Sequence, residues 1–378
     1  MTAPQTLTPS RTVLVAGASG LIGQATVEAL AARGDADVIG VSRRPPVAMP
    51  TERFVHLPLD LSDARACADA VAAGPPVSHL VFAALHEKPG LVAGWRDAGQ
   101  MDRNRAMLAN LLGPLAETGA LRHVSLLQGT KAYGVHRRPI PYPARERWER
   151  DPHPNFYWLQ EDLLREAAAR HGFGFTIWRP QIVFGTAHGV AMNPLLALGA
   201  FAALCRETGA PFAYPGGPAY PLEATDADLT AQAMLWAMDA PQADGEIFNI
   251  TNGDVFAWPH LWPVIAGAFG VDAAPAAPLR LAEWLPSRAD AWRRLAARHR
   301  LAEPDLAALL GESHHYADFC MASGHEAAPP PVLVSTIKLR QAGFAGCTDT
   351  EDMIRRHAAG LVARRVLPPL EPREDTTR

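Results

Sequence analysis

Residues 12–33 read TVLVAGASGLIGQATVEALAAR: an apolar run, a loop with three glycines, and a stretch of helix formers. The glycines have the spacing GxxGxxG between an expected strand and an expected helix. In such a unit the first glycine permits a tight turn, the second lets the backbone approach a pyrophosphate, and the third lets helix and strand pack closely. The helix N-terminus adds free N–H groups and its positive dipole end. This order indicates a dinucleotide loop rather than a glycine turn without a ligand. The contacts expected from it are Gly17, Ser19, Gly20, Leu21, Ile22 and Gly23.

The rest of the first half repeats this alternation of short apolar runs and helical stretches. Strands are expected at residues 12–16, 38–41, 54–57, 79–83, 123–127 and 173–178, with helices at 22–33, 63–73, 100–118 and 155–171. Continuous apolar runs separated by helices indicate a parallel sheet that is covered on both faces. We therefore expect an α/β protein with a doubly wound, Rossmann-type sheet.

The pattern loosens after Arg179-Pro180, where helices and prolines dominate. We expect a Rossmann domain over residues 11–185 and a smaller, mostly helical substrate-binding lobe over 186–367, from which the chain returns to the sheet near 246–250. Residues 1–10 and 368–378 are expected to be tails. Because ligands in such folds bind beyond the carboxyl ends of the strands, we expect the substrate between sheet and lobe.

Composition narrows the class of protein. The chain has 378 residues, 48% of them hydrophobic and 20% charged, which is typical of a globular enzyme. A net charge of −4 and the lack of a basic stripe argue against a nucleic-acid partner. No run of about 18 apolar residues predicts a membrane span, and the N-terminus lacks the apolar core of a signal peptide. The four cysteines are scattered without metal-binding spacing. We therefore expect a cytoplasmic protein with no membrane partner and no metal site.

The end of the second expected strand indicates which cofactor binds. An NAD site places an acidic residue there to bind the ribose diol. This chain has Ser42, Arg43 and Arg44 instead, and guanidinium groups bind a 2′-phosphate bidentately. NADP(H) is therefore the expected cofactor. Further contacts are expected from Asp60 and Leu61 beside the adenine, although Asp60 could equally begin a helix, and from the small residues Ala83 and Ala84.

Two residues could carry chemistry. Lys131 is one of only three lysines and follows the fifth expected strand, while Tyr157 begins the next helix. A short-chain dehydrogenase normally places Lys four residues after its catalytic Tyr, which lowers the pKa of the phenol. Here Glu161 stands four residues after Tyr157, and Arg137 stands four residues after Tyr133. By itself Lys131 could equally be an ordinary surface residue.

Taken together, these segments resemble the progesterone 5β-reductase/iridoid synthase-like group of extended short-chain dehydrogenases/reductases over nearly the whole chain. The most specific segments are Asn-Phe-Tyr at residues 155–157 and Asn-Gly-Asp-Val-Phe at 252–256, whereas the nucleotide loop is shared by far more proteins. The resemblance also covers residues 42–45, 127–133, 179–180, 184–185 and 248–249. Two departures stand out: the segment from Gln128 to Lys131 is one residue shorter, and Trp158 occupies the place where a second Tyr often follows.

The resemblance implies NADPH-dependent reduction of a small apolar α,β-unsaturated carbonyl compound, with Lys131 and Tyr157 as catalytic residues. We expect hydride to add to the β-carbon, so that negative charge collects on the carbonyl oxygen. The Tyr157 hydroxyl would then stabilise the enolate, and Lys131 would bias the local field. The further cofactor contacts that the resemblance implies are Gln128, Tyr157, Val183, Ala191 and Met192.

Other functions stay open. One alternative is an NADPH-dependent ketone or aldehyde reductase of the extended type. A sugar-nucleotide epimerase is disfavoured because the Tyr-x-x-x-Lys pair is missing. A non-catalytic NADP(H)-binding regulatory protein is disfavoured by the presence of Lys131 and Tyr157. The oligomeric state, including a homodimer, is also open.

Overall fold

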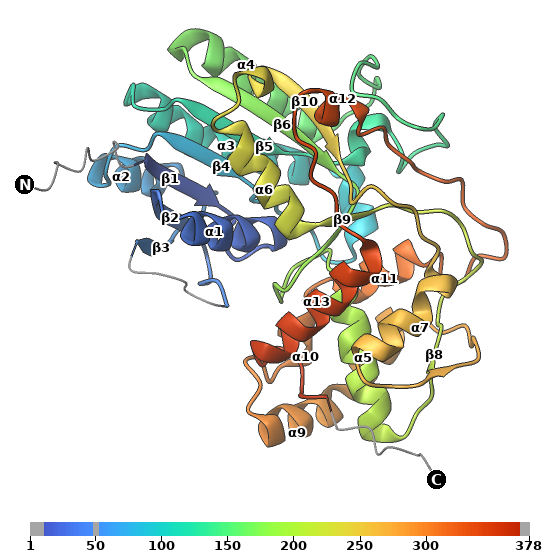
Figure 1. Cartoon of the computed structure of the whole chain (residues 1–378). Helices are drawn as coiled ribbons and strands as arrows, with labels where there is room; N and C mark the ends of the chain where they lie inside the picture. The colour runs from blue at the N-terminus through green and yellow to red at the C-terminus, as the bar shows by residue number, and fades with distance from the viewer. Residues whose placement is uncertain (1–10, 48–52, 371–378) are drawn as a thin grey trace, which may run out of the picture.

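The computed structural model describes residues 11–47 and 53–370. The expected tail at residues 1–10, and the part of the other tail from residue 371 on, lie outside the described residues. A seven-stranded sheet with the order β10-β6-β5-β4-β1-β2-β3 and parallel pairing forms the centre of one half of the molecule (Figure 1). Its strands are β1 (Arg11–Ala16), β2 (Ala36–Ser42), β3 (Phe54–Pro58), β4 (His79–Phe82), β5 (His123–Leu127), β6 (Gly174–Pro180) and β10 (Glu246–Ile250).

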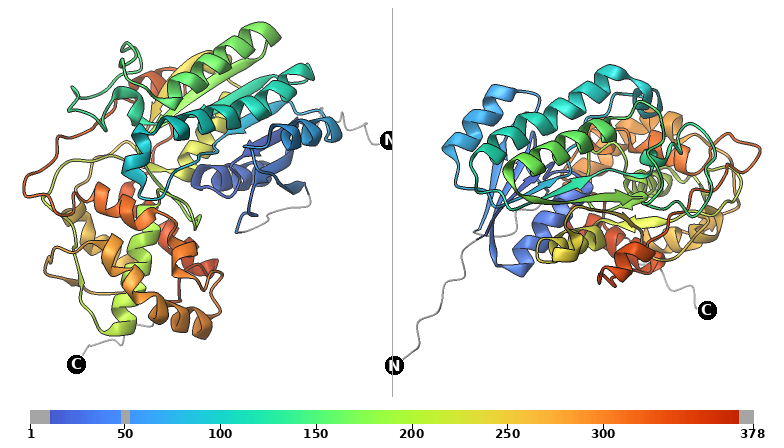
Figure 2. Two further views of the ribbon diagram at one scale, coloured as in Figure 1. Left: turned by 180° about the vertical axis from the view of Figure 1, so that it is seen from behind. Right: turned by 90° about the horizontal axis from the view of Figure 1, so that it is seen from above.

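Helices cover both faces of this sheet (Figure 2). One face carries α1 (Leu21–Arg33) and α6 (Ala227–Ala237), and the other carries α2 (Ala64–Ala73), α3 (Ala98–Glu117) and α4 (Phe156–His171). Along β1, Val13 and Val15 pack on the α1 side, whereas Leu14 and Ala16 pack on the α3 side. Successive side chains of a strand point to opposite faces, so a strand covered on both sides must be apolar throughout. The predicted doubly wound, Rossmann-type fold is confirmed.

The strand order reverses between β1 and β4. From β1 the chain moves outward through β2 and β3, and then crosses to β4 on the other side of β1. The loops that follow two such strands diverge and leave a crevice beyond the carboxyl edge of the sheet. The glycine loop and the segment after β4 therefore border one crevice.

The second half of the chain is mostly helical, as expected. Its central helix, α5 (Pro194–Thr208), is buried at every position from Pro194 to Cys205, as is typical of a helix enclosed in a core. The helices that share this core are α7 (Trp258–Ala268), α8 (Leu281–Trp284), α9 (Ala289–His299), α10 (Leu306–Leu310), α11 (Ser313–Cys320) and α13 (Thr350–Ala363).

Short elements complete the fold. Two small strand pairs were not expected: β7 (Ile182–Phe184) with β9 (Ala224–Asp226), and β8 (Phe212–Ala213) with β11 (Ala273–Ala274). The short 3₁₀ helices are η1 (Leu91–Arg96), η2 (Thr130–Tyr133), η3 (Pro241–Ala243) and η4 (Pro286–Arg288). Such short runs show no hydrophobic period, so sequence patterns do not reveal them.

More of the second half returns to the sheet than the sequence suggested. β10 pairs with β6 as expected, but α6 also packs against α1, and α12 (Ile337–Gln341) lies beside β10. The division into residues 11–185 and 186–367 stays a prediction. Among the helices described, none has both the length and the hydropathy needed to cross a membrane.

Candidate active site

A cavity of about 810 Å³ opens at the carboxyl edge of the sheet and extends beneath the helical half of the molecule. Its walls contain the predicted site residues Gly17, Ser19, Gly20, Leu21, Ile22, Ser42, Arg43, Arg44, Asp60, Leu61, Ala83, Ala84, Gln128, Lys131, Tyr157, Val183, Ala191 and Met192. Gly23 lies outside the wall, on the first turns of α1, where a Cβ atom would collide with the Gly17 carbonyl oxygen. Gly23 therefore lets the first turn of α1 pack closely against the glycine loop.

The glycine loop is built for close approach. Gly17 has a φ of +85°, and a Cβ atom there would lie 2.8 Å from the backbone of Ala83 and Ala84. Gly20 caps α1 with no side-chain hydrogen bond, so the first N–H groups of the helix stay open. An open helix N-terminus beside a glycine turn fits the phosphates of a dinucleotide.

The arginines after β2 are arranged differently from one another. The Arg43 guanidinium lies near Asp60. The pKa of Asp60 lies below its usual range, mainly because Ser62 donates hydrogen bonds to the carboxylate, and the positive charge of Arg43 lowers it further. Arg44 instead donates to the carbonyl oxygens of Gly189, at 2.9 Å, and His188, at 3.3 Å. The Ser42 hydroxyl donates to the Arg44 carbonyl at 2.6 Å. The structure thus brings all three to the cavity, with Arg44 and Ser42 already engaged by the chain itself.

Sequence reasoning missed two further basic groups at this end. Arg103, on α3, lines the cavity, and its Nη1 lies 3.3 Å from Nε2 of His86, which also lines it. Burial is the main cause that lowers the pKa of His86, and Arg103 lowers it further. No motif marks either residue, because they meet only when α3 packs beside the segment after β4.

One asparagine holds the two predicted catalytic segments together. Asn155 caps α4, accepting a hydrogen bond from the Tyr157 backbone N–H at 3.0 Å, and its Nδ2 donates to the Lys131 carbonyl at 3.1 Å. Lys131 lies on η2 and Tyr157 in the first turn of α4. The N-cap signal before an expected helix could have indicated Asn155 from the sequence.

Tyr157 lies over a buried polar layer. Gln128 donates from Nε2 to the Tyr157 carbonyl oxygen at 3.1 Å, and its Oε1 accepts from Nε of Arg179 at 3.1 Å. Arg179 lies 3.6 Å from Glu161, the residue that stands where a short-chain dehydrogenase normally has its lysine. Arg150 and Arg165 lie closer to Glu161, at 3.0 and 3.1 Å, so the partners of this carboxylate are arginines.

The Lys131 ammonium has a buried acidic partner that the sequence did not reveal. Its Nζ lies 3.4 Å from Oε1 of Glu87 and 4.2 Å from the centre of the Trp95 ring. The exposed fractions of the two side chains are 15% for Lys131 and 2% for Glu87. Burial lowers the pKa of Lys131, and Glu87 opposes that shift.

The Tyr157 hydroxyl is poised as a donor. Tyr157 is 6% exposed, and within residues 11–47 and 53–370 its hydroxyl makes no hydrogen bond. Burial raises the pKa of Tyr157 well above its usual value; the Glu87 charge adds to the shift and Arg179 opposes it. A phenol that keeps its proton can donate to an oxygen that becomes negative.

Aromatic side chains from the helical half close the far end of the cavity. Phe319 of α11 is 50% exposed, and its ring meets Trp95 edge-on with 5.2 Å between the centres. Tyr316, one turn earlier, stacks on Phe319 at 6.4 Å. Glu312 accepts a hydrogen bond from the Gly90 N–H at 2.9 Å, so α11 is tied to the loop that carries Trp95. This end of the cavity suits an apolar ligand.

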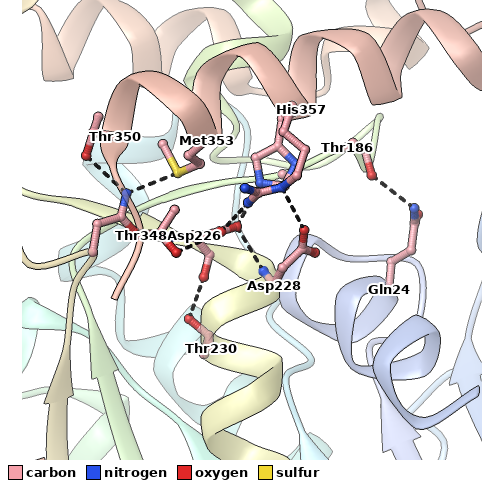
Figure 3. A network of polar contacts seen from close by, with 12 residues as sticks. Gln24, Thr186, Asp226, Asp228, Thr230, Thr348, Thr350, Met353 and His357 are labelled. Atoms are coloured by element: carbon pink, nitrogen blue, oxygen red, sulfur yellow. Dashed lines mark hydrogen bonds and ion pairs between the residues drawn. The ribbon is translucent and has the colours of Figure 1, made fainter. Parts of the chain in front are cut away.

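A second polar cluster lies away from the cavity, between α6 and α13 (Figure 3). Asp226, Asp228 and His357 bring possible metal-ligand atoms within 4.8 Å of one another. Asp226, 2% exposed, already pairs with His357 at 2.8 Å and with Arg356, and it caps α6. Burial raises the pKa of Asp226, but His357 and Arg356 outweigh it and hold the pKa below its usual range. The chain supplies the cations here, so we interpret the cluster as a clamp between helices. The expected absence of a metal site stays a prediction.

Comparison with known proteins finds relatives of this chain. Residues 13–251 match the family described as "NAD dependent epimerase/dehydratase family". The chain is 29% identical over 376 residues to an (S)-8-oxocitronellyl enol synthase of Camptotheca acuminata, covering 94% of this chain and 93% of the relative. It is 30% identical over 314 residues to a 3-oxo-Delta(4,5)-steroid 5-beta-reductase of Arabidopsis thaliana, covering 78% of this chain and 79% of the relative.

Solved structures share the fold at lower identity. A UDP-N-acetylglucosamine 4-epimerase from Methanobrevibacter ruminantium superposes with a TM-score of 0.66 at 15% identity, covering 94% of this chain and 100% of that one. A UDP-glucose 4-epimerase from Thermus thermophilus, in complex with NAD, gives a TM-score of 0.62 at 17% identity, covering 93% and 98%. At such identities the likeness shows the fold alone.

Proposed function

The chain belongs to the NAD dependent epimerase/dehydratase family and, within it, to the progesterone 5β-reductase/iridoid synthase-like group, and from that premise we propose that it is an NADPH-dependent enone reductase. The proposed reaction transfers hydride to the β-carbon of an α,β-unsaturated ketone or aldehyde. The printed name of the Arabidopsis relative refers to reduction of a 3-oxo-Δ4,5-steroid, which is a conjugated ketone.

The observation that carries the proposal is that Lys131 and Tyr157 both line the cavity that the glycine loop borders. The two residues come from separate segments, and Asn155 binds both. A protonated phenol and an ammonium in the same cavity are groups that can stabilise an enolate. The proposal is that Lys131 and Tyr157 together take the role of the missing Tyr-x-x-x-Lys pair.

The residues would act in a simple order. When bound, the nicotinamide cofactor supplies the hydride. As the β-carbon accepts it, charge moves to the carbonyl oxygen of the substrate, and the Tyr157 hydroxyl donates a hydrogen bond to that oxygen. Lys131 adds a positive field beside it. Such stabilisation is worth most where water is excluded, and the Trp95–Phe319 contact covers this end of the cavity.

The choice of NADPH over NADH is part of the proposal. A nicotinamide cofactor fits the open N-terminus of α1, and the Thermus epimerase is described with NAD. In this chain Arg43 and Arg44 stand where an NAD site would place a carboxylate, and Arg103 adds a third guanidinium to the wall. We expect these cations to bind a 2′-phosphate. A small apolar carbonyl substrate, cytoplasmic localisation and a homodimer stay predictions.

To test the proposal, the purified protein is mixed with NADPH and one acceptor at a time. The measurement is the loss of absorbance of the reduced nicotinamide. Conjugated enones and enals should be reduced, and their saturated counterparts of equal size should not. Equal turnover of a saturated ketone would favour the simple carbonyl reductase. Tight NADPH binding without turnover of any acceptor would favour the regulatory protein.

A further inference from the structure

Glu87 lies on the loop after β4, and it is held from the side opposite the cavity. Its Oε2 accepts a hydrogen bond from Nε2 of Gln100 at 2.6 Å. Gln100 is itself fixed in the first turn of α3: Asp97 accepts its backbone N–H at 2.7 Å, and its Oε1 accepts the Lys88 N–H at 2.8 Å. The carboxylate therefore has a defined orientation before any ligand arrives.

Gly94 makes this orientation possible. A Cβ atom at Gly94 would collide with Oε1 of Gln100, so the glycine leaves the space that the amide occupies. The chain from Asp97 through Gln100 to Glu87 thus ends at the Lys131 ammonium, which in turn contacts the face of Trp95. Surface ion pairs usually contribute little to the free energy of folding. The Glu87 carboxylate is buried and held on both oxygens, and its partner ammonium is buried too, so removal of one partner should have a larger effect.

We propose that Glu87 is a positioning residue for the proposed reduction. It fixes the Lys131 ammonium and keeps both Lys131 and Tyr157 protonated. Both residues can then donate toward the substrate oxygen. The inference rests on the proposed function and adds a residue that the motifs do not contain. An enzyme that oxidises an alcohol needs its tyrosine as a phenolate, because the phenolate acts as the base. The surroundings of Tyr157 favour the protonated phenol instead.

The electrostatics agree with the geometry. Glu87 acts on both members of the pair, opposing the lowered pKa of Lys131 and adding to the raised pKa of Tyr157. Glu87 is the charge that acts on both groups, so its effect on each can be given a sign. Removing one negative charge beside them favours the deprotonated state, whichever residue releases its proton first. The sign of the effect is therefore fixed: loss of the Glu87 charge should move the first deprotonation of the pair to lower pH.

The other titratable groups around the pair do not replace Glu87. From β6, Arg179 opposes the raised pKa of Tyr157. After η2, burial lowers the pKa of His136 to about 4, so His136 is neutral at the working pH. From α11, burial holds the pKa of Tyr316 well above its usual value, so Tyr316 is neutral too. Glu312 lines the same cavity, but its carboxylate accepts from the Gly90 N–H.

The experiment compares Glu87→Gln with Glu87→Asp and with wild type in the full chain. Glu87→Gln keeps the size and a hydrogen-bonding oxygen but removes the charge, whereas Glu87→Asp keeps the charge. In the pH profile of kcat, the alkaline limb of Glu87→Gln should move down by about one unit or more. Near that limb kcat should fall about tenfold, with KM and the NADPH dissociation constant nearly unchanged. Glu87→Asp should recover much of the loss. The matched control is Glu246→Gln, which removes the partner of Lys338 at an exposed pair.

A second measurement does not depend on turnover. With only three lysines in the chain, isotope-labelled methyl groups on the lysine nitrogens give few NMR signals, and Lys131→Arg identifies the one from Lys131. The pKa of Lys131 should be lower in Glu87→Gln than in wild type. An unchanged pKa, or an alkaline limb that stays in place or moves upward, overturns the role of Glu87 even if the enone reductase itself is correct. Failure of wild type to reduce any enone overturns the proposed function, and the NMR titration then still decides the role of the ion pair.

Discussion

The Tyr157 hydroxyl oxygen lies 3.1 Å from the point that a Cβ atom on Gly129 would occupy. Gly129 has a φ of 174°, an extended conformation that any residue adopts, so backbone freedom is not the reason for a glycine here. The reason is space: the phenol packs directly over the backbone between β5 and η2. Distances closer than about 3.4 Å force one neighbour to yield, and here that neighbour is the proposed donor.

Gly129→Ala should therefore impair turnover without unfolding the protein. The added methyl displaces the hydroxyl by a few tenths of an ångström, and we expect kcat to fall about tenfold because catalytic donors tolerate little misplacement. NADPH affinity should change little. Gly113→Ala is the control, since a Cβ atom on this exposed position of α3 meets no atom within 4 Å, and it should leave kcat unchanged. Equal kcat in wild type and Gly129→Ala would show that the phenol does not act from this position.

Tyr157→Phe should lose about 10²–10³ in kcat, the usual cost of removing one donor to a developing oxyanion. Its NADPH dissociation constant should stay close to that of wild type, because the ring and its packing remain. The exposed Tyr142 offers the matched control, Tyr142→Phe. Steady-state turnover and fluorescence titration with NADPH are the two measurements. Retention of wild-type kcat in Tyr157→Phe would remove the phenol from the mechanism.

Arg43→Ala should weaken NADPH binding about tenfold, the effect of losing one charge-assisted contact to the 2′-phosphate. NADH lacks that phosphate, so its affinity should change by less than about twofold. Arg65→Ala, at an exposed site on α2, controls for a general change of charge. Calorimetric titration with both nucleotides separates the cases: equal weakening of NADPH and NADH would mean that Arg43 does not recognise the 2′ group.

Asp226→Asn should destabilise the fold by about 3 kcal/mol at neutral pH, because it leaves buried His357 without its charged partner. The pKa of Asp226 is depressed in the folded state, so its contribution is present above the unfolded pKa of about 4 and disappears as pH falls below that value. The difference in unfolding free energy between wild type and variant should therefore shrink in acid. Urea denaturation across pH measures it, with the exposed Asp69→Asn as control. A melting temperature that rises with divalent cations in wild type but not in Asp226→Asn would instead make this cluster a metal site.

The sheet could be predicted because burial on both faces leaves a direct trace in the sequence: β1, β4 and β5 are short apolar runs, and the glycines after β1 fix where the chain turns. The packing of α6 was not predictable in the same way. Its apolar residues look like those of any lobe helix, and only the tertiary structure shows that they face α1.

The same distinction holds for the candidate site: residues within local motifs could be predicted, and residues brought together only by packing could not. Lys131 and Tyr157 were found because short motifs surround them. Glu87 was missed because its partner lies 44 residues along the chain, and nothing in the sequence of an isolated Glu before a Lys-Pro-Gly turn indicates that it is buried. Asn155 was named only as part of a motif, although its position before α4 predicts a cap. Contacts between segments that are distant in sequence leave no local signal, so they had to come from the structure.

Arg44 connects the two ends of the ligand path. Its guanidinium donates to the carbonyl oxygens of His188 and Gly189, on the segment that leads to α5, while its backbone lies two residues after the end of β2, beside the expected adenosine site. Both carbonyls accept from the single Nη2 nitrogen. If the proposed 2′-phosphate binds that nitrogen, it competes with residues 188–189, and we then expect the residence time of the dinucleotide to depend on how firmly this segment is held.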